Sequence, residues 1–158
     1  RVTTDLSSTT VADYTSIFIR AIRVFNGFVY VGGNYSGTDE TVPSVGIWKN
    51  QILSSDGELG EKELVLDWGE LAGANSNITG ITFDENSAMY ISSDANIAIG
   101  IYSSEGIFSE LFPKIISAPI SKMTWGTTNY LYLNYRGNPR AVYRLDVGLN
   151  GAIYHGRN

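Results

Sequence analysis

The sequence predicts an all-β protein made of antiparallel four-stranded sheets, and two observations support this prediction. The first is a β-hairpin pattern that occurs three times, beginning at Ile19, Ile78 and Ile120. Each copy has an apolar strand, a short turn and a second apolar strand, as in residues 120–134, which read ISKMTWGTTNYLYLN. The second is composition, because aromatic residues, which favour strands, make up 12% of the chain and include ten tyrosines. Repetition of a unit of about forty residues indicates a repeat protein.

The first repeat is expected at residues 17–72, after a polar lead-in arm at residues 1–16. Its four strands are expected at residues 17–24, 28–31, 45–53 and 62–68. Asn26 and Gly27 separate the first two strands, and both residue types accept the positive φ that a two-residue hairpin turn requires. The polar segment 33–44 is expected to be an inserted loop, because loops tolerate differences in length between repeats.

The second and third repeats are expected at residues 73–118 and 119–158. The second has expected strands at residues 78–83, 88–92, 97–102 and 107–112. The third has expected strands at residues 120–125, 130–133 and 140–146, and a fourth that begins at Ala152 after an Asn150-Gly151 turn. Three sets of residues align between the repeats: Ile22, Ile81 and Met123; Val24, Phe83 and Trp125; Tyr30, Tyr90 and Tyr132.

With these three hairpins and the aligned tyrosines, residues 17–158 resemble β-propeller proteins as a class. The first two strands of each repeat are apolar on both faces, so we expect each sheet to be packed between others, as propeller blades are. Propellers have about four to eight blades, and three cannot close a ring. The resemblance therefore implies a partial β-propeller: a segment of a larger ring, a ring completed by further copies, or sheets stacked in another way. The family motifs of WD, kelch and sialidase propellers are absent.

Composition excludes several kinds of partner and site. The net charge is −5 and the basic residues are scattered, so no nucleic-acid partner is expected. No apolar run is long enough for a membrane-spanning helix. With no Cys and a single His, the chain offers no zinc site, and we expect no metal and no cofactor.

Two arginines are candidate binding residues. Arg20 and Arg23 lie on the first strand of the first repeat, where the other repeats carry hydroxyl residues: Thr79, Thr82, Ser121 and Thr124. If this strand lines a central channel, some of these side chains face it and could bind an anion or a sugar. The alternative is that they are charged and polar groups that lie beside water at a channel mouth.

Two tyrosines are candidate sugar-stacking residues. Tyr35 and Tyr135 lie in inserted segments that break the repeat register, so their rings are not required for the core. Acidic pairs such as Asp84-Glu85 could in principle serve a glycosidase. Asp84-Glu85 falls in an expected hairpin turn, where acidic residues are ordinary turn formers. No catalytic residue is predicted.

The function that these observations favour is a non-enzymatic structural or protein-interaction module. Its expected partners are another protein or further copies of the chain that complete the propeller. The Ser-, Thr- and Asn-rich, cysteine-free composition suits an extracellular or virion setting, such as a virion tail or a cell-surface assembly. One alternative is a carbohydrate-binding propeller. The other is a segment of a propeller hydrolase whose catalytic residues lie elsewhere.

Overall fold

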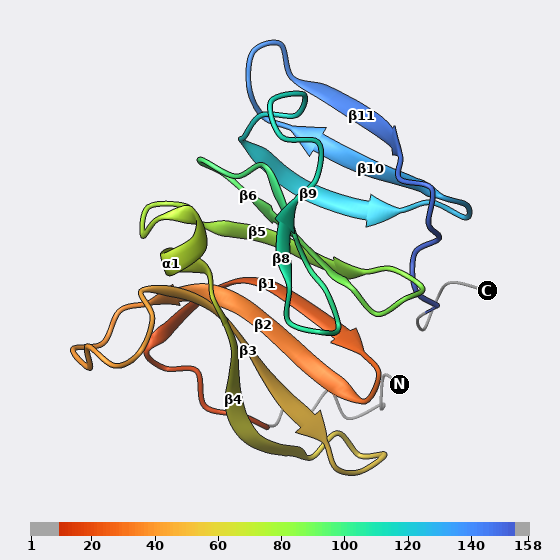
Figure 1. Cartoon of the computed structure of the whole chain (residues 1–158). Coiled ribbons are helices and arrows are strands. Elements are labelled where there is room, and N and C mark those ends of the chain that lie inside the picture. The colour runs from red at the N-terminus through yellow and green to blue at the C-terminus, as the bar shows by residue number, and fades with distance from the viewer. Residues whose placement is uncertain (1–9, 154–158) are drawn as a thin grey trace.

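Three antiparallel sheets build the protein, as a computed structural model that describes residues 10–153 shows (Figure 1). The first sheet contains β1 (Ile17–Phe25), β2 (Phe28–Tyr35), β3 (Val45–Ile52) and β4 (Leu59–Asp67), side by side in chain order. The second contains β5 (Ile78–Phe83), β6 (Met89–Ser93), β7 (Ile99–Tyr102) and β8 (Phe108–Glu110) in the same order. The third contains β9 (Ile120–Trp125), β10 (Tyr130–Tyr135) and β11 (Ala141–Asp146). The predicted all-β fold with antiparallel four-stranded sheets is confirmed.

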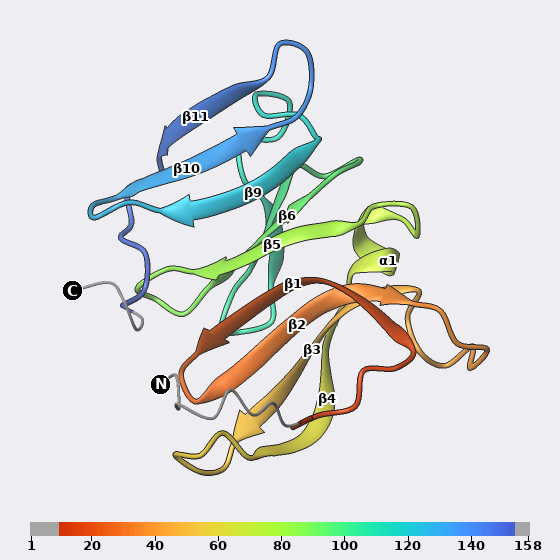
Figure 2. The same cartoon turned by 180° about the vertical axis from the view of Figure 1, so that it is seen from behind.

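The sheets stack face to face, with β5 between β1 and β9 (Figures 1 and 2). One apolar core lies between the first and second sheets and includes Ile47, Trp68, Ile78 and Phe83. A second core, between the second and third sheets, includes Tyr90, Ile120, Trp125, Leu131 and Leu133. All five residues of β6 are buried, because this strand is covered on both faces. The three sheets are therefore named the first, second and third blades.

The same aromatic contact joins each blade to the next. The ring of Tyr30 in the first blade lies 4.8 Å from the ring of Phe83 in the second. The ring of Tyr90 in the second blade lies 5.3 Å from the ring of Trp125 in the third, edge to face. Tyr30 and Tyr90 are aligned positions, and so are Phe83 and Trp125. The repeat in sequence is thus also a repeat in packing.

The expectation that β1 is covered on both faces is wrong. Ile22 and Val24 are 65% and 48% exposed, because no sheet formed by residues 10–153 lies on that side of the first blade. Part of the same face is covered from the arm, where the Tyr14 hydroxyl donates to Asn50 Oδ1 at 2.5 Å. Lys62 Nζ lies 5.0 Å from the centre of the Tyr14 ring. Among the described residues, none covers Ile22 and Val24 on the β1 side of this face.

The prediction of a fourth strand in the third repeat is also wrong, because Gly151 and Ala152 lie against the second blade and not beside β11. The chain turns at Gly148, which has φ +75°, and not at Asn150-Gly151. Gly151 then forms an antiparallel bridge with Asp84 in the second blade, and Ala152 N donates to Phe83 O at 2.9 Å. Glu85 directs this return, because its carboxylate accepts from both N and Nδ2 of Asn150 at 3.0 Å. Residue 154 lies outside the described range.

A short helix replaces the end of the predicted strand at residues 62–68. Helix α1 (Trp68–Ala72) begins after Asp67, whose side chain accepts from Glu70 N at 2.9 Å and so caps the helix. The Trp68 side chain is fully buried and meets Phe108 edge to face. Within residues 10–153, no helix is long and apolar enough to cross a membrane.

Candidate functional site

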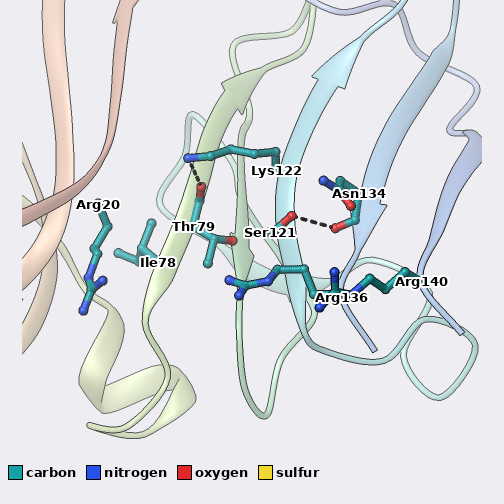
Figure 3. Close-up of a pocket in the computed structure, with 8 residues that line it drawn as sticks. All are labelled: Arg20, Ile78, Thr79, Ser121, Lys122, Asn134, Arg136 and Arg140. Carbon is teal, nitrogen blue, oxygen red and sulfur yellow. Dashed lines mark hydrogen bonds between the residues drawn. The ribbon is translucent and has the colours of Figure 1, made fainter. Parts of the chain in front are cut away.

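A cavity of about 580 Å³ lies where the inner strands of the three blades come together (Figure 3). It is bounded by the beginnings of β5 and β9, the end of β10 and the loop between β10 and β11, with β1 on the opposite side. Eight residues line it: Arg20, Ile78, Thr79, Ser121, Lys122, Asn134, Arg136 and Arg140. Three of the eight come from aligned positions in the three repeats, namely Arg20, Thr79 and Ser121.

A β-bulge at the same place in each blade positions these three side chains. In the first blade Ile19 pairs with Gly33 and Ala21 with Gly32, which leaves Arg20 as the extra residue. The pairings of β5 with β6 and of β9 with β10 shift in the same way around Thr79 and Ser121. A bulge leaves one residue out of the ladder and re-aims its side chain. The repeated bulge therefore places one residue from each blade at the cavity.

The lining is strongly cationic. Arg20, Lys122, Arg136 and Arg140 supply four of the eleven basic residues of a chain whose net charge is −5. No carboxylate is among the eight lining residues. The ion pair between Lys49 and Glu63 lies elsewhere, on β3 and β4. The local charge is thus opposite to the charge of the whole protein.

Hydrogen bonds hold two of the cations in place. Arg20 Nε donates to Asn34 Oδ1 at 3.3 Å, and Asn34 Nδ2 donates to Asn77 Oδ1 at 2.7 Å. Asn77 Nδ2 in turn donates to Asp94 Oδ2 at 2.8 Å, so the chain of bonds runs from the first blade into the second. On the other side, Lys122 Nζ donates to the Thr79 carbonyl at 3.1 Å.

The other predicted binding residues do not line this cavity. Arg23 Nη2 donates to Thr82 Oγ1 in the second blade at 3.4 Å. The half-buried Tyr35 accepts from Asp39 N through its hydroxyl. Tyr135, also half-buried, lies 5.6 Å from the ring of Tyr143. A role of Arg20, Arg23, Tyr35 or Tyr135 in ligand binding stays a prediction.

Both tyrosines pack on the loops that follow them. A Cβ atom placed on Gly37 would overlap the Tyr35 ring, and one placed on Gly137 would overlap the Tyr135 ring. One face of each ring is therefore used by the protein itself. Trp48, in contrast, is buried in the first blade at 4% exposure.

Sequence reasoning missed Lys122, Arg136 and Arg140. A signal for Arg136 was present, because the sequence Asn-Tyr-x-Gly ends β2 at residues 34–37 and β10 at residues 134–137. That repeat puts Arg136 directly after the strand that pairs with β9, at the same end as Ser121. Within residues 10–153, no group of three or more His, Cys, Asp or Glu side chains could hold a metal ion.

A second candidate site is the first-blade outer face, defined by the paired residues Ile22, Val24, Val31, Trp48 and Leu64. Cross-strand partners share a face, so the pairs Ile22–Val31, Val31–Trp48 and Trp48–Leu64 extend it over all four strands. Val31 and Trp48 at its centre are already buried, so the surface open to a partner lies at its two sides. Leu64 is 50% exposed at one side of this face, and Ile22 and Val24 are exposed at the other.

Its counterpart at the far end of the stack is the third-blade outer face, defined by Tyr130, Tyr132, Val142 and Arg144. Tyr132 pairs with Arg144, whose guanidinium lies 4.5 Å from the centre of the Tyr130 ring. Tyr132 is 36% exposed and Val142 is 74% exposed. The stack thus ends in two different surfaces, one apolar and one aromatic with a cation.

Comparison with known proteins identifies the architecture and no family. No protein-family model and no curated protein matches the chain. The fold is that of propeller blades. A solved structure of a luciferin-regenerating enzyme, a propeller, superposes with a TM-score of 0.56 over 88% of this chain at 9% sequence identity. The match covers 64% of that enzyme, and a likeness at this identity shows the fold alone.

Proposed function

We propose that this chain is a non-enzymatic β-propeller-type module that binds protein through the first-blade outer face. The occupant we propose is the third-blade outer face of a second copy, placed as the next blade in the stack.

The observation that supports this occupant is the repeated aromatic contact between blades. In the two contacts within the chain, Tyr30 meets Phe83 and Tyr90 meets Trp125. Tyr132 is the third tyrosine of this series, and Val24 is the position that aligns with Phe83 and Trp125. Both are exposed at opposite ends of the stack. Tyr132 of one copy against Val24 of another would continue the same series.

Burial supplies the driving force for this assembly. Complete burial of one Ile, Val or Leu side chain stabilises by about 1.5–3 kcal/mol, and Ile22, Val24 and Leu64 are each about half exposed or more. Two copies of three blades make six, which lies within the usual range of about four to eight. If each copy uses one outer face of each kind, two equivalent contacts close the ring as a symmetric dimer.

The carbohydrate-binding alternative requires an open aromatic face. Trp48 is buried, and Tyr35 and Tyr135 each pack one face on a loop glycine, so this geometry favours it less. The hydrolase alternative and the extracellular or virion setting have no support beyond composition and fold, and both stay predictions.

Sedimentation equilibrium at increasing protein concentration tests the proposal. We expect a mass approaching twice the 17.3 kDa of one chain, and the Ile22→Glu variant should stay at 17.3 kDa because it buries a charge in the contact. Ile115→Glu is the matched control, since Ile115 is exposed in the segment between β8 and β9. A wild-type chain that stays monomeric, or an Ile22→Glu variant that dimerises as the wild type does, would contradict the second-copy occupant.

A further inference from the structure

We propose that the cationic cavity binds a phosphate group, either free or esterified to a small polyol. This site uses none of the residues that define the two outer faces, although Asn134 pairs with Val142 and so borders the third-blade outer face. The inference rests on the charge of the cavity, on its hydrogen-bonding groups and on its size.

The unbalanced positive charge of the cavity favours an anionic ligand. Four cations around one cavity repel each other unless anions balance them, and no carboxylate lines the cavity. The ion-pair and hydrogen-bond partners found for Arg20 and Lys122 within residues 10–153 are an amide and a carbonyl, which carry no formal charge. A bound anion would supply the missing charge. A dianion balances four cations better than a single carboxylate does.

The arginines among these cations favour phosphate as the anion. Three of the four are arginines, and the planar guanidinium group binds two oxygens of a phosphate at once. Figure 3 shows Arg20 on one side of the cavity and Arg136 and Arg140 on the other, with Thr79 and Ser121 between them. An anion in the middle would thus be approached from two sides.

Hydrogen bonds hold both sides of the cavity, the one with Arg20 and the one with Arg136. Arg20 is held through Asn34, Asn77 and Asp94, as described above. The loop with Arg136 is tied to the segment before β9, because Arg136 N donates to the Pro119 carbonyl at 3.0 Å. The backbone on both sides of the cavity is thus held before a ligand binds, which lowers the entropy cost of binding.

Size and the remaining lining point to an organic ligand. A volume of about 580 Å³ is well above that of a phosphate ion and lies in the range of small-molecule sites, about 300–1,000 Å³. The Asn134 amide and the Ser121 hydroxyl can bond a polyol, since Ser121 Oγ makes only a long 3.2 Å bond to the Asn134 carbonyl.

Isothermal titration calorimetry of the full chain with four probes tests the site: glucose 6-phosphate, inorganic phosphate, glucuronate and glucose. Glucose 6-phosphate and glucuronate share the sugar ring and differ at C6, where the first carries a phosphate ester and the second is a carboxylate. We expect both phosphates to bind, glucuronate to bind about tenfold more weakly or not at all, and glucose not to bind. Affinity should fall as salt is added, because the cations are exposed to solvent. Tighter binding of the ester than of inorganic phosphate identifies an esterified ligand; equal binding identifies free phosphate.

Two matched pairs of variants locate the binding. Arg136→Gln and Arg140→Gln should each weaken phosphate binding about tenfold, which is the effect of losing one charged hydrogen-bond donor. Lys122→Gln should weaken it, whereas Lys114→Gln, which removes the same charge in the segment between β8 and β9, should leave it unchanged. Thermal unfolding of each variant shows whether it folds, and Arg136→Gln and Arg140→Gln substitute for each other if one does not.

Three results would overturn the proposal. One is the absence of saturable binding of either phosphate at low salt. Another is binding of glucuronate as tight as that of glucose 6-phosphate. The third is a loss in Lys114→Gln equal to the loss in Lys122→Gln, which would show attraction to the protein surface in general. Because the assembly is measured by mass and the site by calorimetry, failure of one proposal is distinguishable from failure of the other.

Discussion

Removal of the Phe83 ring should lower the free energy of unfolding, because this ring packs the second blade against the first. Phe83 is 4% exposed, its ring stacks on Phe25 with centroids 4.1 Å apart, and Tyr30 approaches it from the same blade. Truncation of a buried Phe to Ala costs about 3–5 kcal/mol, from lost transfer energy and the cavity left behind. The two aromatic contacts, each of which contributes about 0.5–1.5 kcal/mol, place Phe83 in the upper half of that range. We therefore expect Phe83→Ala to lose about 4–5 kcal/mol of unfolding free energy.

Urea unfolding followed by circular dichroism measures this loss. Domains of ordinary stability unfold with about 5–15 kcal/mol, so the midpoint should move far toward zero denaturant. Phe18→Ala is the matched control, because Phe18 is 61% exposed and its ring contacts the Arg20 guanidinium, a contact of about 0.5–1 kcal/mol. If Phe83→Ala and Phe18→Ala differed by less than about 1 kcal/mol, the stacking of blades through Phe83 would be refuted.

Two further predictions concern groups with shifted pKa values. Burial raises the pKa of Tyr14 to about 12, so its protonated hydroxyl stabilises the fold fully below the unfolded pKa of about 10, and this stability is lost as pH rises through 12. Tyr14→Phe should abolish that alkaline loss of stability. At neutral pH the same variant should lose about 1–3 kcal/mol of unfolding free energy, measured by urea unfolding, because Asn50 Oδ1 is left without its donor. Hydrogen bonds from the backbone and then the side chain of Asn150 lower the pKa of Glu85, so the docking of the returning segment holds above the unfolded pKa and fails as pH falls through the lowered one. In the wild type, the Ala152 amide should lose protection from hydrogen exchange over that acid range, after correction for the intrinsic effect of pH. In Glu85→Ala, the same amide should be poorly protected at all pH values. Equal protection in the two proteins would contradict the role of Glu85 in docking this segment.

Local patterns in the sequence predicted the hairpins because their causes are local. Asn26 and Gly27 have φ values of +47° and +79°, as a tight two-residue turn requires, and a turn of this length places Phe25 opposite Phe28. The same dipeptide at Asn150-Gly151 misled, because contacts to Glu85, 65 residues away, determine its conformation. A pairing over that distance has no trace in a short stretch of sequence.

The helix and the cavity show two other limits. Helix α1 could have been found, since Asp67 followed three residues later by Glu70 is a helix-start pattern. The cavity could be predicted only in part, because the repeat alignment gave Arg20, Thr79 and Ser121 but not the loop with Arg136 and Arg140. Where a loop folds relative to a neighbouring strand depends on packing, which spacing along the chain does not encode.

The most direct test of the head-to-tail assembly is an exchange of charges between its two faces. Val24→Arg and Tyr132→Glu should each keep the chain at 17.3 kDa, because each places a charge in both contacts of its own dimer. A mixture of the two variants can form one contact in which the two introduced, opposite charges meet and one contact of wild-type residues. We predict that sedimentation equilibrium of the mixture restores the mass of two chains. A mixture that stays monomeric while the wild type dimerises would contradict the contact of Tyr132 with Val24.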